Sequence, residues 1–155
     1  MKRLLIASDH AGFSLKEKIK IYLEKKGFYV KDLGTHSKER CDYPQYAFSL
    51  AKQISQGRYR QGILICKTGI GNTIVANRLP GVRAALCYNT RAARLSRQHN
   101  NSNVLVLGAL FVKDAQAKRI LNIWLNTTFL GGRHRRRLEQ IREIERQISE
   151  AYKKD

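Results

Sequence analysis

Two patterns of apolar residues alternate along the chain. Five short runs are rich in apolar residues, most of them at nearly every position, as strands buried on both faces of a parallel sheet are. Between them, apolar residues recur every three or four positions, which is the spacing of an amphipathic helix. We predict strands at residues 4–8, 28–34, 62–66, 82–88 and 103–109, and helices at residues 14–27, 42–57, 72–79, 90–100 and 114–129.

Local signals mark the ends of two of these helices. Ser14 and Glu17 have the spacing of a capping box, which predicts the start of the first helix, and Gly27 stands where a helix commonly ends. The second helix is predicted to begin after Pro44 and to end at Gly57.

The alternation of buried strands with helices defines the fold class. It predicts a three-layer α/β/α domain with a five-stranded, parallel, Rossmann-like sheet over residues 1–130. Ligands of such sheets bind beyond the carboxyl ends of the strands, so functional side chains are expected at that edge.

A basic segment, residues 131–155, follows these elements. Its apolar residues have helical spacing, which predicts an amphipathic C-terminal helix that belongs to the same domain. Because no further core element is left to cover its apolar face, we expect this helix to pack on a second subunit. The apolar positions are Leu138, Ile141, Ile144, Ile148 and Tyr152.

Charge and composition limit the possible partners and the cellular compartment of the protein. The 155 residues carry 30 Lys and Arg against 12 Asp and Glu, a net charge of +18 that favours anionic partners of any kind. No apolar run is long enough to span a bilayer, and the N-terminal run is too short for a signal peptide. Three cysteines without metal-ligand spacing indicate free thiols, so we predict a cytoplasmic protein without a membrane partner or a metal site.

Residues with acid–base chemistry follow several predicted strands. Asp9 and His10 come after the first strand, and Cys66 ends the third. His99 and Asn100 close the helix before the fifth strand, and we assign them to the same edge of the sheet. Together these residues predict a site for proton transfer.

The segment CKTGIGN, residues 66–72, does not match a nucleotide motif. A P-loop lysine follows the glycines, whereas Lys67 precedes them, and the dinucleotide fingerprint needs a third glycine where Ile74 stands. A glycine turn that leads into a helix instead aims backbone N–H groups at one point and favours an anion there. The competing interpretation is a tight turn without a ligand.

Cys66 favours the first of these interpretations. Its position beside a helix N-terminus predicts a lowered thiol pKa, suited to a proton-transferring base or a nucleophile. A buried structural cysteine is the alternative, and it is what we predict for Cys87.

A basic cluster, RHRRR at residues 133–137, opens the C-terminal segment. Arg133 and Arg137 are four residues apart and share a helical face, where guanidinium groups can bind phosphate bidentately. Arg135 and Arg136 are interpreted as solvated charges.

Several long segments resemble the ribose-5-phosphate isomerase B family, within the larger group that includes galactose-6-phosphate isomerases. They are SDHAGFSLKEKI, DYPQYA, GILICKTGIGNTIVANRLPGVRAALC, ARLSRQHNNSNVLVLGA and FLGGRHRRRLEQI, in an order that runs from residue 3 to about residue 145. The resemblance implies an aldose–ketose isomerase that interconverts ribose 5-phosphate and ribulose 5-phosphate through a cis-enediolate. It also implies no metal or organic cofactor, and a homodimer or dimer of dimers with shared active sites.

The resemblance further implies roles for individual residues. Cys66 would move the proton between two carbons, while His99, aided by Asp9, would open the sugar ring. Thr68 would bind the enediolate oxygen, as oxyanion donors do, together with the backbone N–H groups of Lys67, Gly69, Ile70 and Gly71. The remaining substrate-binding residues are His10, Arg133 and Arg137 for the phosphate, and Tyr43 and Asn100 for the sugar.

Two positions depart most from the family pattern, and Asn101 in place of a common aspartate is a milder departure. The family usually has glycine where this chain has Lys67, and commonly has arginine where it has Leu110. If that glycine is needed for a positive φ, Lys67 strains the turn by about 1–2 kcal/mol. Otherwise its ammonium group lies near the enediolate or the phosphate. Loss of the arginine weakens phosphate binding by about 1.5–3 kcal/mol, unless Lys67 or Lys113 replaces it.

Other functions stay open at this point. The same chemistry could act on a six-carbon sugar phosphate such as allose or galactose 6-phosphate, or require a partner chain, as in two-component galactose-6-phosphate isomerases. A catalytically impaired member could instead bind anions or nucleic acid through the +18 charge. Because no aromatic stacking motif or base-reading module accompanies the charge, nucleic acid is not the predicted partner.

Overall fold

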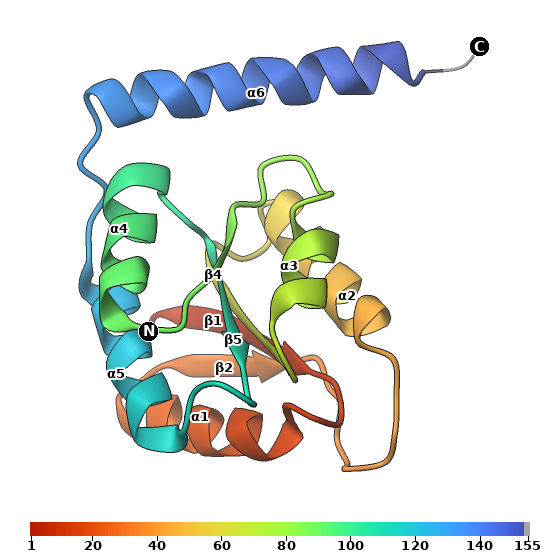
Figure 1. The fold of residues 1–155 in the computed structure, drawn as a ribbon, viewed down its shortest axis with the longest axis vertical. Helices are drawn as coiled ribbons and strands as arrows, with labels where there is room; N and C mark the ends of the chain where they lie inside the picture. The colour runs from red at the N-terminus through yellow and green to blue at the C-terminus, as the bar shows by residue number, and fades with distance from the viewer. Residues whose placement is uncertain (154–155) are drawn as a thin grey trace.

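Five parallel strands form the centre of the computed structural model, which describes residues 1–153 (Figure 1). Their order in the sheet is β2-β1-β3-β5-β4, and every neighbouring pair is parallel. The predicted fold class is therefore confirmed. The strands are β1 (Arg3–Ser8), β2 (Tyr29–Asp32), β3 (Gly62–Cys66), β4 (Ala84–Leu86) and β5 (Val104–Gly108).

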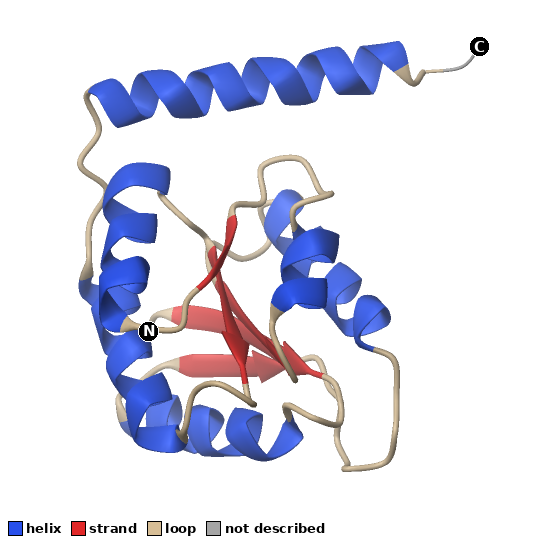
Figure 2. Cartoon of the chain, viewed as in Figure 1, coloured by secondary structure: helices blue, strands red, loops and turns tan. Residues whose placement is uncertain are grey.

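Helices cover both faces of this sheet, as Figure 2 shows. One apolar cluster joins the sheet to α1 and α5, and a second joins its other face to α2 and α3. Successive strand residues serve the two clusters in turn, since Leu4 and Ile6 belong to the first and Leu5 to the second. Within residues 1–153 the helices are α1 (Phe13–Lys25), α2 (Tyr43–Ser55), α3 (Ile70–Ala76), α4 (Thr90–Asn100), α5 (Asp114–Asn126) and α6 (Arg133–Ala151).

The predicted capping box of the first helix is wrong. Helix α1 begins at Phe13, so Ser14 lies inside its first turn, and the N-cap is Gly12. A Cβ on Gly12 would lie 2.6 Å from the carbonyl oxygen of Ile65, so only glycine lets the helix start this close to β3. The carboxylate of Asp9 accepts the N–H of Gly12 at 3.1 Å, so a loop residue supplies the stabilising oxygen.

Helix α6 contacts the rest of the chain at several places, one of which is Arg135 beside the ring of Phe129. His134, in its first turn, is buried against α4, and further along the carboxylate of Glu145 accepts the N–H of Gly81 at 3.0 Å. The apolar stripe remains open, since Ile144 is 53% and Ile148 54% exposed. Packing of this helix on a second subunit therefore remains a prediction, and residues 154–155 of the segment lie outside the described residues. None of the helices in residues 1–153 has the length and hydropathy of a membrane span.

The thiol of Cys87 is expected to make stability fall in alkaline solution. Cys87 is 1% exposed, as a structural cysteine should be, and burial raises its pKa from 9.0 to about 11. Above pH 9 the unfolded chain loses this proton while the folded chain keeps it, so the stabilisation is complete below pH 9 and is lost as the pH rises to 11. The loss is about 3 kcal/mol.

Urea unfolding of the wild type and of Cys87→Ala at pH 8, 9, 10 and 11 measures this contribution. The difference in unfolding free energy between the two proteins should shrink as the pH rises. A difference that stays constant across this range would contradict a raised pKa.

Candidate active site

Cys66 stands at the end of β3, at the start of the glycine turn that leads into α3. Its side chain is 3% exposed, and the N–H of Gly69 donates to its sulfur at 3.2 Å. Gly69 has a φ of 82°, and a Cβ there would lie 2.4 Å from Leu86 Cδ1, so this position requires glycine. The turn thus folds backbone N–H groups back over the thiol.

The prediction that the helix N-terminus lowers the thiol pKa of Cys66 is wrong. Burial raises its pKa, backbone N–H groups of Asn72 and Gly69 offset part of that rise, and the charge of Asp9 adds to it. Desolvation prevails because the strand that delivers Cys66 is buried along its whole length. The thiol is therefore protonated at neutral pH, and Asp9 is close enough to influence it.

Lys67 fits its turn without strain. Among the non-glycine residues that the structure describes, only Asn101 has a positive φ, so the strained alternative for Lys67 is excluded. The Lys67 side chain is exposed, and its carbonyl oxygen accepts the N–H of Leu110 at 2.9 Å. The two positions that depart most from the family pattern are therefore direct neighbours.

Close contacts fix the shape of the turn around Thr68. The Thr68 hydroxyl accepts the N–H of Ile70 at 3.2 Å. A Cβ on Gly108 would lie 2.3 Å from the Thr68 carbonyl oxygen, so β5 also requires glycine at its end. Gly71 lies against the ring of Tyr43, where a Cβ would be 2.3 Å from Cζ. The structure thus brings Tyr43 to the turn, as predicted for a residue lining the sugar.

His10 lies at this same edge of the sheet, after β1. Its Nδ1 lies against the backbone of Cys41, 3.2 Å from the nitrogen and 3.1 Å from the carbonyl oxygen. The ring is half-buried, and Nε2 is the ring nitrogen left to contact a ligand. Together, the turn after Cys66, Asp9, His10 and Tyr43 form what we call the cysteine half-site.

The assignment of His99 and Asn100 to this edge is wrong. Helix α4 starts after the carboxyl end of β4 and runs back, so its last residues lie beside Val104, where β5 begins. Any crossover helix between parallel strands must return the chain to the opposite edge. His99 therefore lies one strand length, about 17 Å, from the edge that carries Cys66.

His99 instead meets the basic cluster at the start of α6. Its ring stacks on that of His134, with centroids 4.2 Å apart and planes 10° from parallel. Burial lowers the pKa of His134, and the neighbouring charges of His99, Arg133 and Arg137 lower it further. His134 is thus a neutral, 7% exposed ring that orients His99. We call His99, His134, Arg133 and Arg137 the histidine half-site.

Sequence reasoning gave no individual role to His134. Its spacing was the available signal, because His134 and Arg137 are three residues apart and share a face of the helix with Arg133. This face of the helix packs on His99, which is distant in sequence. Asn100, next to it, is exposed.

The predicted phosphate ligands are also divided between the two half-sites. His10 follows β1 at the carboxyl edge, whereas Arg133 and Arg137 begin α6 beyond the amino edge, as the positions of β1 and α6 in Figure 1 show. One chain therefore cannot bring these three side chains to one phosphate. Within residues 1–153 no group of three or more His, Cys, Asp or Glu side chains could hold a metal ion.

Comparisons with known proteins identify the family of this chain. The sequence pattern of the Ribose/Galactose Isomerase family matches residues 4–141. Ribose-5-phosphate isomerase B of Escherichia coli is 46% identical over 94% of this chain and 97% of its own. The structure of the Clostridium thermocellum enzyme of that name superposes with a TM-score of 0.92 at 44% identity, covering 94% of this chain and 99% of that one. The Mycoplasma genitalium enzyme, solved with bound ribulose-5-phosphate, has a TM-score of 0.89 at 42% identity and covers 93% and 96%.

Proposed function

Since the chain belongs to the ribose/galactose isomerase family, we propose that it interconverts ribose 5-phosphate and ribulose 5-phosphate. The observation that carries this proposal is the cysteine half-site, where a thiol at a strand end is held beside a turn of backbone N–H groups. The reaction uses no metal or organic cofactor, and it takes place in the cytoplasm, which keeps the three free cysteines reduced.

The chemistry follows from the groups of the two half-sites. His99 opens the furanose ring, with Asp9 assisting, and the Cys66 thiolate removes the proton from C2 of the open aldose. The electrons pass to the carbonyl oxygen, and Thr68 with the backbone N–H groups of residues 67–71 stabilises the enediolate charge. Return of the proton to C1, with transfer of the hydroxyl proton from O2 to O1, completes the ketose.

The complete site needs a second copy of the chain. Because the half-sites lie about 17 Å apart on one chain, the histidine half-site of a partner has to face the cysteine half-site. Arg133 and Arg137 would then join His10 at the phosphate, and the partner's side would also bring Asn100 to the sugar. The exposed stripe of α6 supplies an apolar surface for such a dimer.

An assay of ribulose 5-phosphate formation from ribose 5-phosphate, with chelator present, tests the proposal. We expect turnover with chelator, and faster turnover on ribose 5-phosphate than on allose or galactose 6-phosphate. Preference for a six-carbon substrate would overturn the proposed substrate while retaining the chemistry. Absence of turnover on all three would overturn the isomerase itself.

Lys67 is expected to replace the missing arginine at position 110. Their backbones are joined by a 2.9 Å hydrogen bond and both side chains are exposed, so an ammonium at 67 can serve the phosphate that a guanidinium at 110 would serve. Lys67→Ala should lower kcat/KM for ribose 5-phosphate by about tenfold, the effect of losing one charge-assisted hydrogen bond.

Adding Leu110→Arg to the Lys67→Ala variant should recover most of this loss. Lys25→Ala, which removes an exposed lysine at the end of α1 and so at the opposite edge of the sheet, is the matched control and should leave kcat/KM unchanged. If Lys67→Ala behaves like the control, Lys67 does not bind the phosphate.

A further inference from the structure

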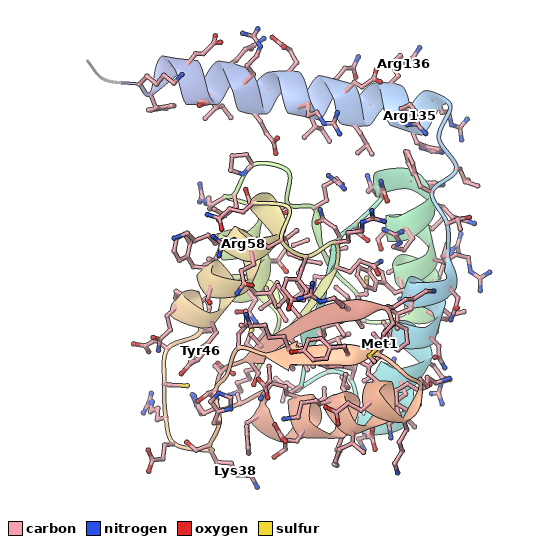
Figure 3. The ribbon with its side chains drawn as sticks, turned by 180° about the vertical axis from the view of Figure 1, so that it is seen from behind. Met1, Lys38, Tyr46, Arg58, Arg135 and Arg136 are labelled. Carbon is pink, nitrogen blue, oxygen red and sulfur yellow. The ribbon has the colours of Figure 1, made fainter. Side chains whose placement is uncertain are left out.

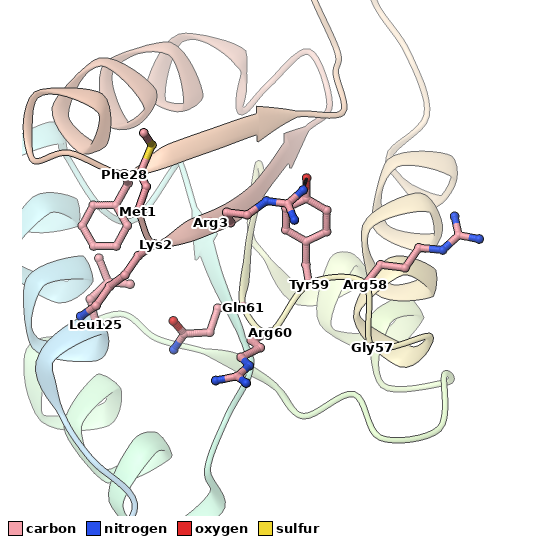
Figure 4. Close-up of a pocket in the computed structure, with 10 residues that line it drawn as sticks. All are labelled: Met1, Lys2, Arg3, Phe28, Gly57, Arg58, Tyr59, Arg60, Gln61 and Leu125. Carbon is pink, nitrogen blue, oxygen red and sulfur yellow. Dashed lines mark hydrogen bonds between the residues drawn. The ribbon is translucent and has the colours of Figure 1, made fainter.

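A cavity of about 470 Å³ opens at the amino edge of the sheet, on the far side from Cys66 (Figure 4). Arg3 begins β1 there, and Gln61 immediately precedes β3. The length of β1 places this cavity about 20 Å from Asp9 and the cysteine half-site. Neither half-site contributes a residue to its lining. The lining residues are Met1, Lys2, Arg3, Phe28, Gly57, Arg58, Tyr59, Arg60, Gln61 and Leu125.

The two ends of the cavity differ in chemistry. Phe28 and Leu125 give one end an apolar surface with the Lys2 side chain beside it, whereas Arg3, Arg58 and Arg60 come from the other side, as Figure 4 shows. No aspartate or glutamate lines the cavity, nor does any line the adjoining cavity that shares Tyr59, Arg60 and Gln61. The positive charge of this end is therefore not neutralised locally.

Several polar groups of the lining are free to bind a ligand. In the part of the chain that the structure describes, Arg58 and Arg60 are exposed and their guanidinium groups make no hydrogen bond or ion pair. Gln61 is half-buried between the two ends, and its side-chain amide likewise has no partner there. Arg3 is held in place, since it donates to the Tyr59 hydroxyl at 2.8 Å and lies 4.5 Å from the centre of that ring.

We propose that this cavity binds a nucleotide, of the nucleoside diphosphate class, at a site separate from the isomerase site. The volume is within the range of small-molecule sites, about 300–1,000 Å³. Unpaired guanidinium groups suit a diphosphate, which they can bind bidentately. The flat apolar surface of Phe28 and Leu125 suits a base, and the Gln61 amide can both donate to and accept from its edge.

Neither the isomerase chemistry nor the comparisons require this site, so it stands apart from the proposed function. The arginines of this cavity account for part of the net charge of +18, and the proposed isomerase reaction does not use them. A diffuse cationic surface would attract any polyanion in proportion to charge, whereas this cavity should distinguish ligands by their base as well.

Calorimetric titration of the wild-type protein at 0.15 M salt with ADP, pyrophosphate and adenosine tests the proposal. We expect ADP to bind, with pyrophosphate and adenosine each at least about tenfold weaker, since each lacks one half of the ligand. The double variant Arg58→Ala/Arg60→Ala should weaken ADP by about 10- to 100-fold. Its ribose 5-phosphate turnover, which shows that it is folded, should not change.

The matched control is Lys38→Ala/Arg136→Ala, which removes two exposed charges far from the cavity (Figure 3). It should bind ADP as the wild type does. Equal weakening of ADP by both double variants, or equal affinity for ADP and pyrophosphate, would show non-specific attraction and overturn the proposal. Absence of ADP binding would overturn the proposal as well. It would be overturned even if a single-stranded oligonucleotide bound to the protein.

Discussion

Cys66→Ala is expected to lower the turnover of ribose 5-phosphate by about 10³-fold or more. In the proposed reaction this thiol carries the proton between C1 and C2, and general base catalysis contributes about 10²–10⁴-fold. The thiol is 3% exposed and faces the N–H of Gly69, so alanine removes the base while the turn keeps its glycine conformation. Loss of proton exchange between substrate and solvent, followed by NMR in D₂O, is the direct measurement.

Cys87→Ala is the matched control for this prediction, because it removes a second buried thiol that faces no substrate. It should keep wild-type turnover at neutral pH. If Cys66→Ala retains activity within a few-fold of the control, another group is the base and the proposed mechanism is wrong.

The pH profile supplies a further check on Cys66. Burial and Asp9 raise the thiol pKa above its ordinary value of 9.0, so only a small fraction is thiolate at neutral pH. Below that pKa the thiolate fraction increases about tenfold for each unit of pH. The logarithm of kcat/KM should therefore keep rising between pH 7 and 9. A plateau below pH 8 would indicate a base with a lower pKa.

Mixing two inactive variants is expected to restore about one quarter of the wild-type activity. Cys66→Ala lacks the base and His99→Ala lacks the ring-opening group, so each homodimer is inactive. If each site takes Cys66 from one chain and His99 from its partner, a mixed dimer contains one intact site and one with both defects. Random reassortment makes half of the dimers mixed, with one working site of two in each.

The measurement needs subunit exchange, by co-expression of the two variants with different affinity tags. The unselected mixture should show about one quarter of the wild-type activity, and the mixed dimers isolated by purification on both tags should show about one half. His134→Ala in place of His99→Ala tests the histidine stack, because the 4.2 Å separation makes His134 the support for His99. Recovery in the mixed dimer would establish that the half-sites come from different chains. Lack of recovery, with mixed dimers present, would show that one chain builds the whole site and would overturn the shared arrangement.

Most of the fold could be predicted because it depends on periodicity. Continuous apolar runs specified strands buried on both faces, and the bounds of β3 and α4 agree with the prediction to the residue. The start of α1 could not be predicted, since Gly12 and Asp9 act there through contacts with β3 that are distant in sequence. Such packing determines where the helix starts even where a local signal, here the Ser14–Glu17 spacing, favours another start.

The candidate site was predicted less completely. Residue types and motif order pointed to Cys66, His99 and the arginines, and the family that they indicated is confirmed. Their roles remain predictions. The predicted direction of the Cys66 pKa shift was wrong. A helix N-terminus can be recognised in the sequence, whereas the extent to which a strand end is buried cannot. Burial proved to be the larger effect on the pKa of Cys66.

By itself, the sequence of this protein determined the layers and the strand segments and indicated candidate groups for the proposed reaction, because all three depend on residue type and short-range spacing. Only the tertiary structure decided where those groups lie. A crossover helix returns the chain to the opposite edge, so Cys66 and His99 end one strand length apart. The same geometry pairs His99 with His134, excludes the strained alternative for Lys67 and gathers three arginines around an unrelated cavity. These features depend on contacts between segments that are remote in sequence, and no local sequence pattern encodes such contacts.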